Sequence, residues 1–207
     1  MRDVEQLIGA ARGLVASGGR HLLGVVGPPG SGKSTAARAV VDALGEQACL
    51  VPMDGFHLAQ SELARLGRAG RKGAPDTFDA LGYVSLLRRL QTADEDVVYA
   101  PTFDRTLEEP VAGAIAVDRN VPLVVTEGNY LLVENEPWSR IRGLLDQVWY
   151  LDLDDAARRH RLVTRHMEHG RSEADASRWV ERVDEPNAVL VAAGRHRADA
   201  YLTLTAQ

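Results

Sequence analysis

The chain has 207 residues, of which 45% are hydrophobic and 26% are charged, and this is typical of one globular domain, residues 1–207, with a full core. Its net charge of -5 and its pI near 5.7 argue against a nucleic-acid backbone as the main partner. No apolar run approaches the ~20 residues of a membrane span, and the first residues, MRDVEQ, are too polar for a secretory signal.

Five short apolar runs alternate with segments long enough to form helices. The runs cover residues 21–26, 48–53, 122–127, 147–153 and 200–204. Such a pattern predicts an α/β fold, in which a mostly parallel sheet is covered by helices and ligands bind at the carboxyl ends of the strands. Two further runs, 97–103 and 111–117, flank a polar segment and predict a projecting hairpin.

The sequence GPPGSGKST lies between the first predicted strand and a predicted helix. It matches the pattern G-x-x-x-x-G-K-S, whose glycines let backbone N–H groups converge on phosphate oxygens. Lys33 is expected to reach the β and γ phosphates of a bound ATP, and Ser34 to ligate Mg²⁺. Prolines stiffen the first half of the loop, and the helix that follows presents its positive end to the anion. The residues expected to bind the nucleotide are Gly27, Pro28, Pro29, Gly30, Ser31, Gly32, Lys33, Ser34 and Thr35.

Lysine is rare in this chain, because only Lys33 and Lys72 among the 24 basic residues are lysines. A compact point charge on a flexible stem is therefore expected to matter at these two positions, although two remaining lysines are also compatible with chance. The single cysteine, Cys49, allows no internal disulfide and is typical of a reducing compartment. These features predict a cytoplasmic protein.

Two carboxylates follow predicted strands at the edge where the phosphate loop also lies. Asp54 comes after the run 48–53, and Glu127 ends the run 122–127. Two acids beside a Mg-triphosphate predict metal ligation and a base for an incoming hydroxyl, although each acid alone could also be a helix cap or turn former. The chain lacks the N-K-x-D element of guanine-specific switches and the L-S-G-G-Q stretch of ABC ATPases, so a small-molecule kinase is favoured.

Six motifs occur in an ordered succession: GPPGSGKST, VPMDGFHL, RKGAPDTFD, APTFDR, TEGNYLL and DEPNA. As a set they resemble the uridine kinase, phosphoribulokinase and pantothenate kinase group of P-loop kinases, and within it the bacterial fructose transport system kinases. The resemblance runs from about residue 21 to the C-terminus. It implies a three-layer α/β/α P-loop NTPase fold with a mostly parallel five-stranded sheet, a substrate-side hairpin at about 97–117 and a helical lid at about 156–185.

The resemblance also assigns roles to residues. It implies that Asp54 is the base toward the substrate hydroxyl and that Glu127 helps to hold Mg²⁺, so the expected metal ligands are Ser34, Asp54 and Glu127. The histidine after Asp54 is interpreted either as a substrate contact or as a packed loop residue. The residues expected to contact the acceptor are His57, Arg71, Lys72, Asp76, Asp79, Phe103, Arg105 and Glu127.

Arginines at helical spacing mark the lid. Arg158, Arg161 and Arg165 are three and four residues apart and share one helical face, with Arg171 near the end of the helix. Such a cluster repels itself unless it meets an anion, and the expected catalytic pair is Arg161 and Arg165. The alternative is a solvated face balanced by aspartates before and within the helix. Residues without an assigned catalytic role are interpreted as surface or ATP-proximal histidines (His160, His166, His169), as core (Trp138, Trp149, Tyr150), or as either a helix cap or a phosphate contact (Asn187).

We therefore expect an ATP-dependent kinase that phosphorylates a hydroxyl of a small metabolite, with ATP and Mg²⁺ as cofactors. The expected acceptor is a sugar such as fructose or a related alcohol, with a nucleoside or a pantothenate-like compound as the alternative. A nucleotide-sensing regulator of a transport system is a rival of another class, which would not need Asp54 as a hydroxyl base. The expected partner is a small-molecule acceptor, with no nucleic acid and no membrane, and a homodimer stays open.

Overall fold

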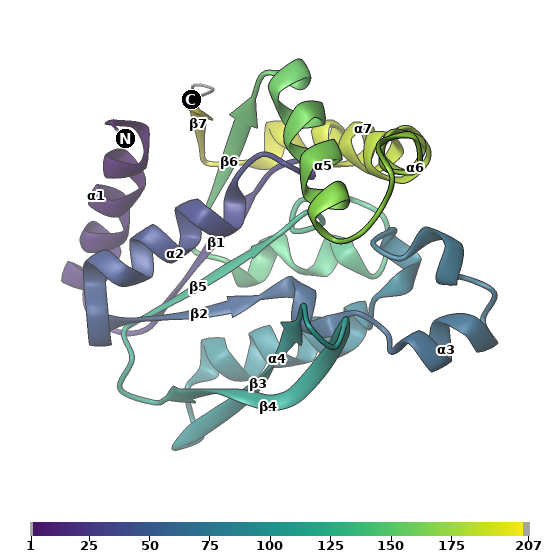
Figure 1. Cartoon of the computed structure of the whole chain (residues 1–207). Helices are drawn as coiled ribbons and strands as arrows, with labels where there is room; N and C mark the ends of the chain where they lie inside the picture. Colours follow the sequence, from purple (N-terminus) through teal and green to yellow (C-terminus); the bar gives the residue numbers. More distant parts are fainter. Residues whose placement is uncertain (1, 205–207) are drawn as a thin grey trace.

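The computed structural model describes residues 2–204. Five strands form one parallel sheet, in which neighbouring strands are distant in sequence (Figure 1). In spatial order they are β2 (Ala48–Pro52), β5 (Leu123–Gly128), β1 (His21–Val26), β6 (Gln147–Leu153) and β7 (Ala200–Leu204). All pairings are parallel, so the carboxyl ends of β2, β5 and β1 meet at one edge. The predicted α/β architecture and its five strands are confirmed.

Alternating side chains of the central strands build a core on each face of the sheet. Leu23 and Val25 of β1 pack with α1 (Arg2–Ala16) and α2 (Lys33–Leu44), while Leu22 and Val26 pack on the opposite face. That second face is covered by α4 (Ala80–Thr92), by part of α7 (Glu185–Ala193) and by the 3₁₀ turns Trp138–Arg140 and Arg142–Leu144. The molecule thus has three layers, with helices on both faces of the sheet (Figure 1).

A two-stranded antiparallel sheet lies apart from the main sheet. It consists of β3 (Val97–Asp104) and β4 (Glu109–Asp118), with a register shift between Ala100 and Thr102. Its base is buried against the second core through Val98 and Val117, while its tip reaches the end of β2 (Figure 1). The short helix α3 (Gln60–Arg65) and the loop after it lie beyond that tip.

Helices after β6 cover the edge where the strands end. Helix α5 (Asp155–Glu168) starts at Asp154, whose carboxylate accepts from the N–H groups of Ala156 and Ala157. A turn at Gly170 leads to α6 (Glu173–Trp179), which continues through a π-helical turn (Val180–Asp184) into α7. We refer to residues 155–184 as the lid segment. Among residues 2–204, no helix has both the length and the apolar composition needed to cross a membrane.

Candidate active site

The loop between β1 and α2 has the backbone shape that its glycines permit. Gly32 precedes α2 with φ of 91°, a left-handed conformation that favours glycine. At Gly27 a Cβ atom would lie 2.5 Å from the carbonyl oxygen of Leu151, so a side chain there would collide with the end of β6. The loop is therefore fixed between two strands, and its backbone N–H groups and the N-terminus of α2 form a cradle for an anion.

Lys33 is the cation of this cradle. Its side chain is only 8% exposed, and Nζ donates a hydrogen bond of 3.2 Å to the carbonyl oxygen of Pro28. Burial lowers the pKa of Lys33 to about 8, although the nearby carboxylates of Glu127 and Asp54 oppose this shift. A desolvated ammonium of this kind attracts an anion strongly, because water screens it little.

Glu127 and Asp54 come together at the sheet edge, because Glu127 lies at the end of β5 and Asp54 follows β2. Glu127 pairs in register with both Val25 and Pro52, and Asp54 follows two residues after Pro52. The hydroxyl of Ser34 donates a hydrogen bond of 3.0 Å to Oε1 of Glu127. Burial and the charge of Asp54 raise the pKa of Glu127 to about 7.

The donor set fits a magnesium ion better than a transition metal. Ser34, Glu127 and Asp54 offer only oxygen atoms, which are the ligands that Mg²⁺ prefers. Among the described residues 2–204, no three His, Cys, Asp or Glu side chains cluster into an all-protein metal site. This is the arrangement expected for Mg²⁺ that is held by one or two protein groups together with phosphate oxygens and water.

A cavity of about 510 Å³ joins the phosphate loop to the hairpin and the lid segment. It brings together residues from both halves of the predicted site. The predicted site residues at its walls are Pro29, Gly30, Lys33, Ser34, Asp54, His57, Lys72, Phe103, Arg105, Glu127 and Arg165. Five other residues predicted to bind the nucleotide do not border the cavity. Of these, Gly27, Pro28, Ser31 and Gly32 belong to the loop, and Thr35 lies in the first turn of α2.

Three residues predicted to contact the acceptor lie outside the cavity wall. Arg71 and Asp76 form an exposed ion pair with each other, with nitrogen–oxygen distances of 3.1 and 2.5 Å. Asp79 is the N-cap of α4, where its carboxylate accepts a hydrogen bond of 2.8 Å from the N–H of Gly82. None of these three residues borders the cavity, so their contact with the acceptor stays a prediction; in the structure the three charges take part in local pairing and capping.

The capping role of Asp79 makes a prediction. Asp79→Ala is expected to lower the free energy of unfolding by about 1 kcal/mol, because an N–H group at the start of α4 loses its acceptor. The KM values for both substrates should change little, since Asp79 does not border the cavity. Urea unfolding together with steady-state kinetics would check both statements, and Asp79→Ser should restore most of the stability. A strong rise in the acceptor KM of Asp79→Ser would instead return Asp79 to the substrate site.

The wall opposite the phosphate loop contains two cations, Lys72 and Arg105, and the rings of Phe103, Phe78 and His57. Nζ of Lys72 donates a hydrogen bond of 2.6 Å to the carbonyl oxygen of Glu108 at the hairpin tip and lies 5.0 Å from the ring centroid of Phe103. Arg105, also at the tip, lies 3.6 Å from the carboxylate of Asp54.

His57 contacts both the ring of Phe103 and the backbone of Asp54. Its ring packs between Phe78 and Phe103 at centroid distances of 4.0 and 4.8 Å, and its Nδ1 lies 2.9 Å from the carbonyl oxygen of Asp54. Burial lowers the pKa of His57, which favours the neutral ring. Of the two interpretations of His57, the structure combines packing with a position on the cavity wall.

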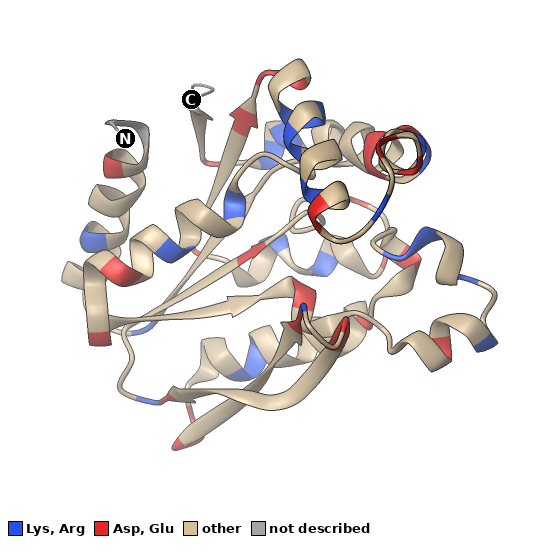
Figure 2. Ribbon diagram, in the orientation of Figure 1, with Lys and Arg blue, Asp and Glu red and all other residues tan. Residues whose placement is uncertain are grey.

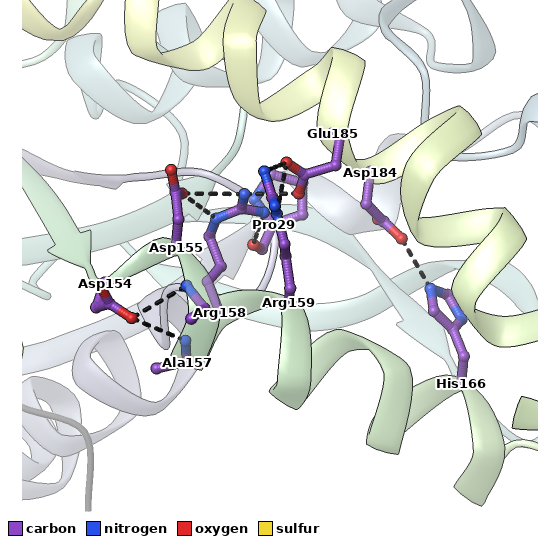
Figure 3. A network of polar contacts seen from close by, with 10 residues as sticks. Pro29, Asp154, Asp155, Ala157, Arg158, Arg159, His166, Asp184 and Glu185 are labelled. Atoms are coloured by element: carbon purple, nitrogen blue, oxygen red, sulfur yellow. Dashed lines mark hydrogen bonds and ion pairs between the residues drawn. The ribbon is translucent and has the colours of Figure 1, made fainter.

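The lid arginines divide into different environments, and the expectation that Arg158 joins a shared anion-binding face is wrong. Arg158 is 1% exposed, and its guanidinium donates to carboxylates of Glu185 at 2.6 Å and Asp155 at 3.1 Å, and to the carbonyl oxygen of Pro29 (Figure 3). The anions that neutralise Arg158 thus belong to the protein. The two aspartates just before the helix also have other partners. Asp154 caps α5, and Asp152 forms an ion pair with Arg195.

Arg165 and Arg161 lie near the phosphate loop. Arg165 borders the cavity. Arg161 does not border it, but its Nη1 lies 3.8 Å from the position that a Cβ of Gly32 would occupy. Figure 2 shows basic residues along α5 and on the loop after α3, and acidic residues at the end of β2.

Arg158 connects the lid segment to the phosphate loop, which leads to a second prediction. Arg158→Met is expected to lower the free energy of unfolding by about 3 kcal/mol and to raise the KM for ATP, because a buried ion pair is broken where α5 contacts Pro29. The matched control is Arg159→Met, which removes the exposed partner of the same Glu185 and should stay within error of the wild type. Denaturant unfolding and ATP kinetics on both variants would test this. Equal effects of the two variants would contradict the structural role of Arg158.

Several residues at the cavity were not among the predicted site residues. Asp184 is buried and pairs with Nε2 of His166 at 2.9 Å (Figure 3). The side-chain amide of Asn187 donates to the carbonyl oxygen of Gly73 at 3.3 Å, so the helix-cap interpretation of Asn187 is wrong. Trp179 borders the cavity with the guanidinium of Arg171 stacked 3.9 Å from its ring centroid. The motif DEPNA could have signalled the first two, whereas no pattern marked Trp179. The remaining such residues at the wall are Gly73, Phe78, Glu108, Gly128, Asn129 and His169.

Two of the three aromatic residues that were predicted to lie in the core are buried. Trp138 and Tyr150 are buried, with 3% and 1% of their surface exposed, whereas Trp149 is only half-buried. His160 is exposed on α5, while His166 and His169 border the cavity.

Comparison with known proteins gives relatives over nearly the whole chain. A protein of Schizosaccharomyces pombe named "Putative uridine kinase" is 35% identical over 183 residues, covering 83% of this chain and 78% of that protein. The crystal structure of a "putative fructose transport system kinase" from Silicibacter sp. TM1040 is 35% identical and has a TM-score of 0.85, covering 94% of this chain and 98% of the other. YFH7 from Saccharomyces cerevisiae shares the fold, with 18% identity, a TM-score of 0.86 and 99% coverage of both chains. No protein-family model matches the chain.

Proposed function

Because this chain belongs to the P-loop kinases of the uridine kinase group, ATP-dependent enzymes that phosphorylate small metabolites, we propose that its acceptor is a sugar or a related alcohol, with fructose as the first candidate. The observation that carries the proposal is the shared cavity of Lys33, Ser34 and Asp54, which places a phosphate cradle and a carboxylate around one space. The description of the relative from Silicibacter as a "putative fructose transport system kinase" supports a sugar as the acceptor.

The residues suggest how the transfer proceeds. The acceptor oxygen attacks the γ-phosphorus, the bond from this phosphorus to the β–γ bridging oxygen breaks, and the hydroxyl proton passes to the carboxylate of Asp54. Lys33 and Arg165 neutralise phosphate charge from opposite sides, one from the loop and one from the lid segment. Ser34 and Glu127 would hold Mg²⁺, with Asp54 nearby, and this ion would neutralise charge on the β and γ phosphates.

A nucleoside acceptor is disfavoured by the use of the aromatic rings. Three aromatic rings, those of Phe103, Phe78 and Trp179, border the cavity. Each ring is already packed: Phe78 against His57 and Tyr130, Phe103 against His57 and Lys72, and Trp179 against Arg171. A base that stacks here would have to displace one of these partners, which favours an acceptor without a large ring system.

Coupled measurement of ADP release over sugars, sugar acids, sugar phosphates, nucleosides and pantothenate tests the proposal. We expect sugars or their derivatives to raise ADP release above the rate in water, and nucleosides and pantothenate to leave it unchanged. A nucleoside or pantothenate as the best acceptor would overturn the sugar assignment. ATP binding without stimulation by any acceptor would favour a nucleotide-sensing regulator.

A further inference from the structure

The acceptor side of the cavity holds two cations from separate segments. Lys72 comes from the loop after α3, and Arg105 comes from the tip of the hairpin, where Lys72 Nζ also meets the carbonyl oxygen of Glu108. Both side chains border the cavity that Asp54 also borders. A nucleotide in the loop would be neutralised by Lys33 and by arginines of the lid segment, so it does not require these two charges.

The charge of Lys72 is not matched by a carboxylate. Among residues 2–204, Lys72 forms no ion pair within 4.0 Å, and its ammonium has only a carbonyl oxygen and the face of Phe103 as partners. An ammonium has three donors, so at least one remains directed to a ligand or to water. Glu108 also borders the cavity, but only its backbone oxygen contacts Lys72.

Three of the four acidic residues at this cavity contact a side chain other than Lys72. Asp184 pairs with His166, Glu127 accepts from Ser34, and Asp54 pairs with Arg105. The last pair is 3.6 Å long, which exceeds a hydrogen bond and leaves donors of the Arg105 guanidinium available. The acceptor side thus holds Lys72 and Arg105 beside the carboxylates of Asp54 and Glu108, and both cations keep donors that make no hydrogen bond to a carboxylate.

The identity of the cation adds a separate observation. Lys72 is one of only two lysines among 24 basic residues, and the other is Lys33 of the phosphate loop. Lysine binds anions as a compact point charge, whereas arginine provides a planar fork. In a chain that otherwise uses arginine, both lysines border one cavity, and one of them faces the expected position of a phosphate.

We propose that the preferred acceptor carries an anionic group, a carboxylate or a phosphate, which binds between Lys72 and Arg105 while its hydroxyl faces Asp54. This inference rests on the proposed kinase function and narrows its substrate class from neutral sugars to sugar acids or sugar phosphates. Binding of the anion gives Lys72 the counter-ion that it lacks and draws Arg105 partly away from Asp54. Asp54 is then left free to accept the hydroxyl proton.

Direct binding tests the anion subsite without any turnover. Inorganic phosphate is titrated calorimetrically into the protein saturated with magnesium and the non-hydrolysable ATP analogue AMP-PNP, so that the phosphate loop is already filled. We expect a dissociation constant of about 10 mM or tighter, weakened about tenfold or more in Lys72→Gln and largely retained in Lys72→Arg. The matched control is Arg88→Gln, which removes an exposed charge on α4 and should bind phosphate like the wild type. Absence of binding to the wild type, or equal binding to Lys72→Gln, would overturn the proposal.

Turnover then distinguishes the two sources of the anion. The acceptors are D-fructose, D-gluconate and D-fructose 6-phosphate, which share a six-carbon chain and differ in charge. We expect kcat/KM for at least one anionic acceptor to exceed that for fructose by about tenfold or more, and Lys72→Gln to reduce this ratio by about tenfold. The Arg88→Gln ratio should equal that of the wild type. A preference for gluconate identifies a carboxylate, and one for the sugar phosphate identifies a phosphate.

The outcomes separate this inference from the proposed function. If fructose is phosphorylated faster than both anionic acceptors, the anion subsite is refuted while the sugar kinase stands. If phosphate binds at Lys72 but none of the three compounds is phosphorylated, the subsite is supported and the sugar assignment fails.

Discussion

Lys33→Met is expected to lower kcat/KM for phosphoryl transfer by about 10³-fold or more. The desolvated ammonium of Lys33 lies in the phosphate cradle, where no other lysine is available and where water screens charge little. Methionine has a similar length and retains the packing, so the loss should come from missing charge stabilisation in the transition state. Steady-state kinetics and ATP titration on purified protein would measure it.

The fold of this variant should persist. Burial lowers the pKa of Lys33, which means that the folded protein disfavours the charged form, and an apolar side chain of equal length removes this cost. We therefore expect the thermal midpoint of Lys33→Met to equal or exceed that of the wild type. An inactive variant that is also unfolded would say nothing about the phosphates, in which case Lys33→Gln serves as the second test. Turnover near the wild-type rate in a folded variant would contradict the assigned role of Lys33.

Asp54→Asn is expected to reduce kcat by about 10²- to 10⁴-fold while the KM for ATP changes only slightly. Asparagine has the same shape and can still contact the acceptor hydroxyl, but it cannot accept a proton. ATP affinity should be retained because Lys33 and the backbone of residues 27–35 form the cradle. The measurement is kcat and both KM values with the best acceptor from the ADP-release assay.

A conservative variant separates a base from a merely structural carboxylate. Asp54→Glu, which keeps the carboxylate but moves it, should recover part of the rate. Near-normal turnover in Asp54→Asn would remove the base assignment. Lost binding of ATP and Mg²⁺ in Asp54→Asn would instead make Asp54 a metal ligand.

The phosphate loop and the sheet edge could be predicted because both depend on short-range rules. Residues 27–35 specify their own backbone shape through glycine, and the apolar runs specify buried strands through continuous hydrophobicity. In a parallel sheet the strand ends meet at one edge, so Asp54 and Glu127 were expected together, and both border the cavity. Even the strand bounds agree closely, since β1, β6 and β7 have the predicted limits.

Charged side chains were harder to place, because their partners are distant in sequence or compete nearby. Arg158 has the same helical spacing as Arg161 and Arg165, yet it is buried because Glu185, which lies 27 residues later, approaches it across the lid segment. The sequence predicts Arg71 and Asp76 as acceptor contacts, whereas in the structure their side chains pair with each other. The same spacing of charged residues is therefore compatible either with an ion pair inside the protein or with a contact to a ligand.

By itself the sequence determined the α/β sheet, the phosphate cradle and the pair of carboxylates at its edge, because periodicity, glycine spacing and strand polarity act over a few residues. Only the tertiary structure decided which charges are neutralised within the protein and which face the cavity. Arg158 is satisfied by Glu185, whereas Lys72 has no carboxylate partner among the described residues, and both results depend on how the lid segment and the hairpin pack against the sheet. Such long-range pairing is set by the balance of desolvation and Coulomb attraction at each site, which no local pattern encodes.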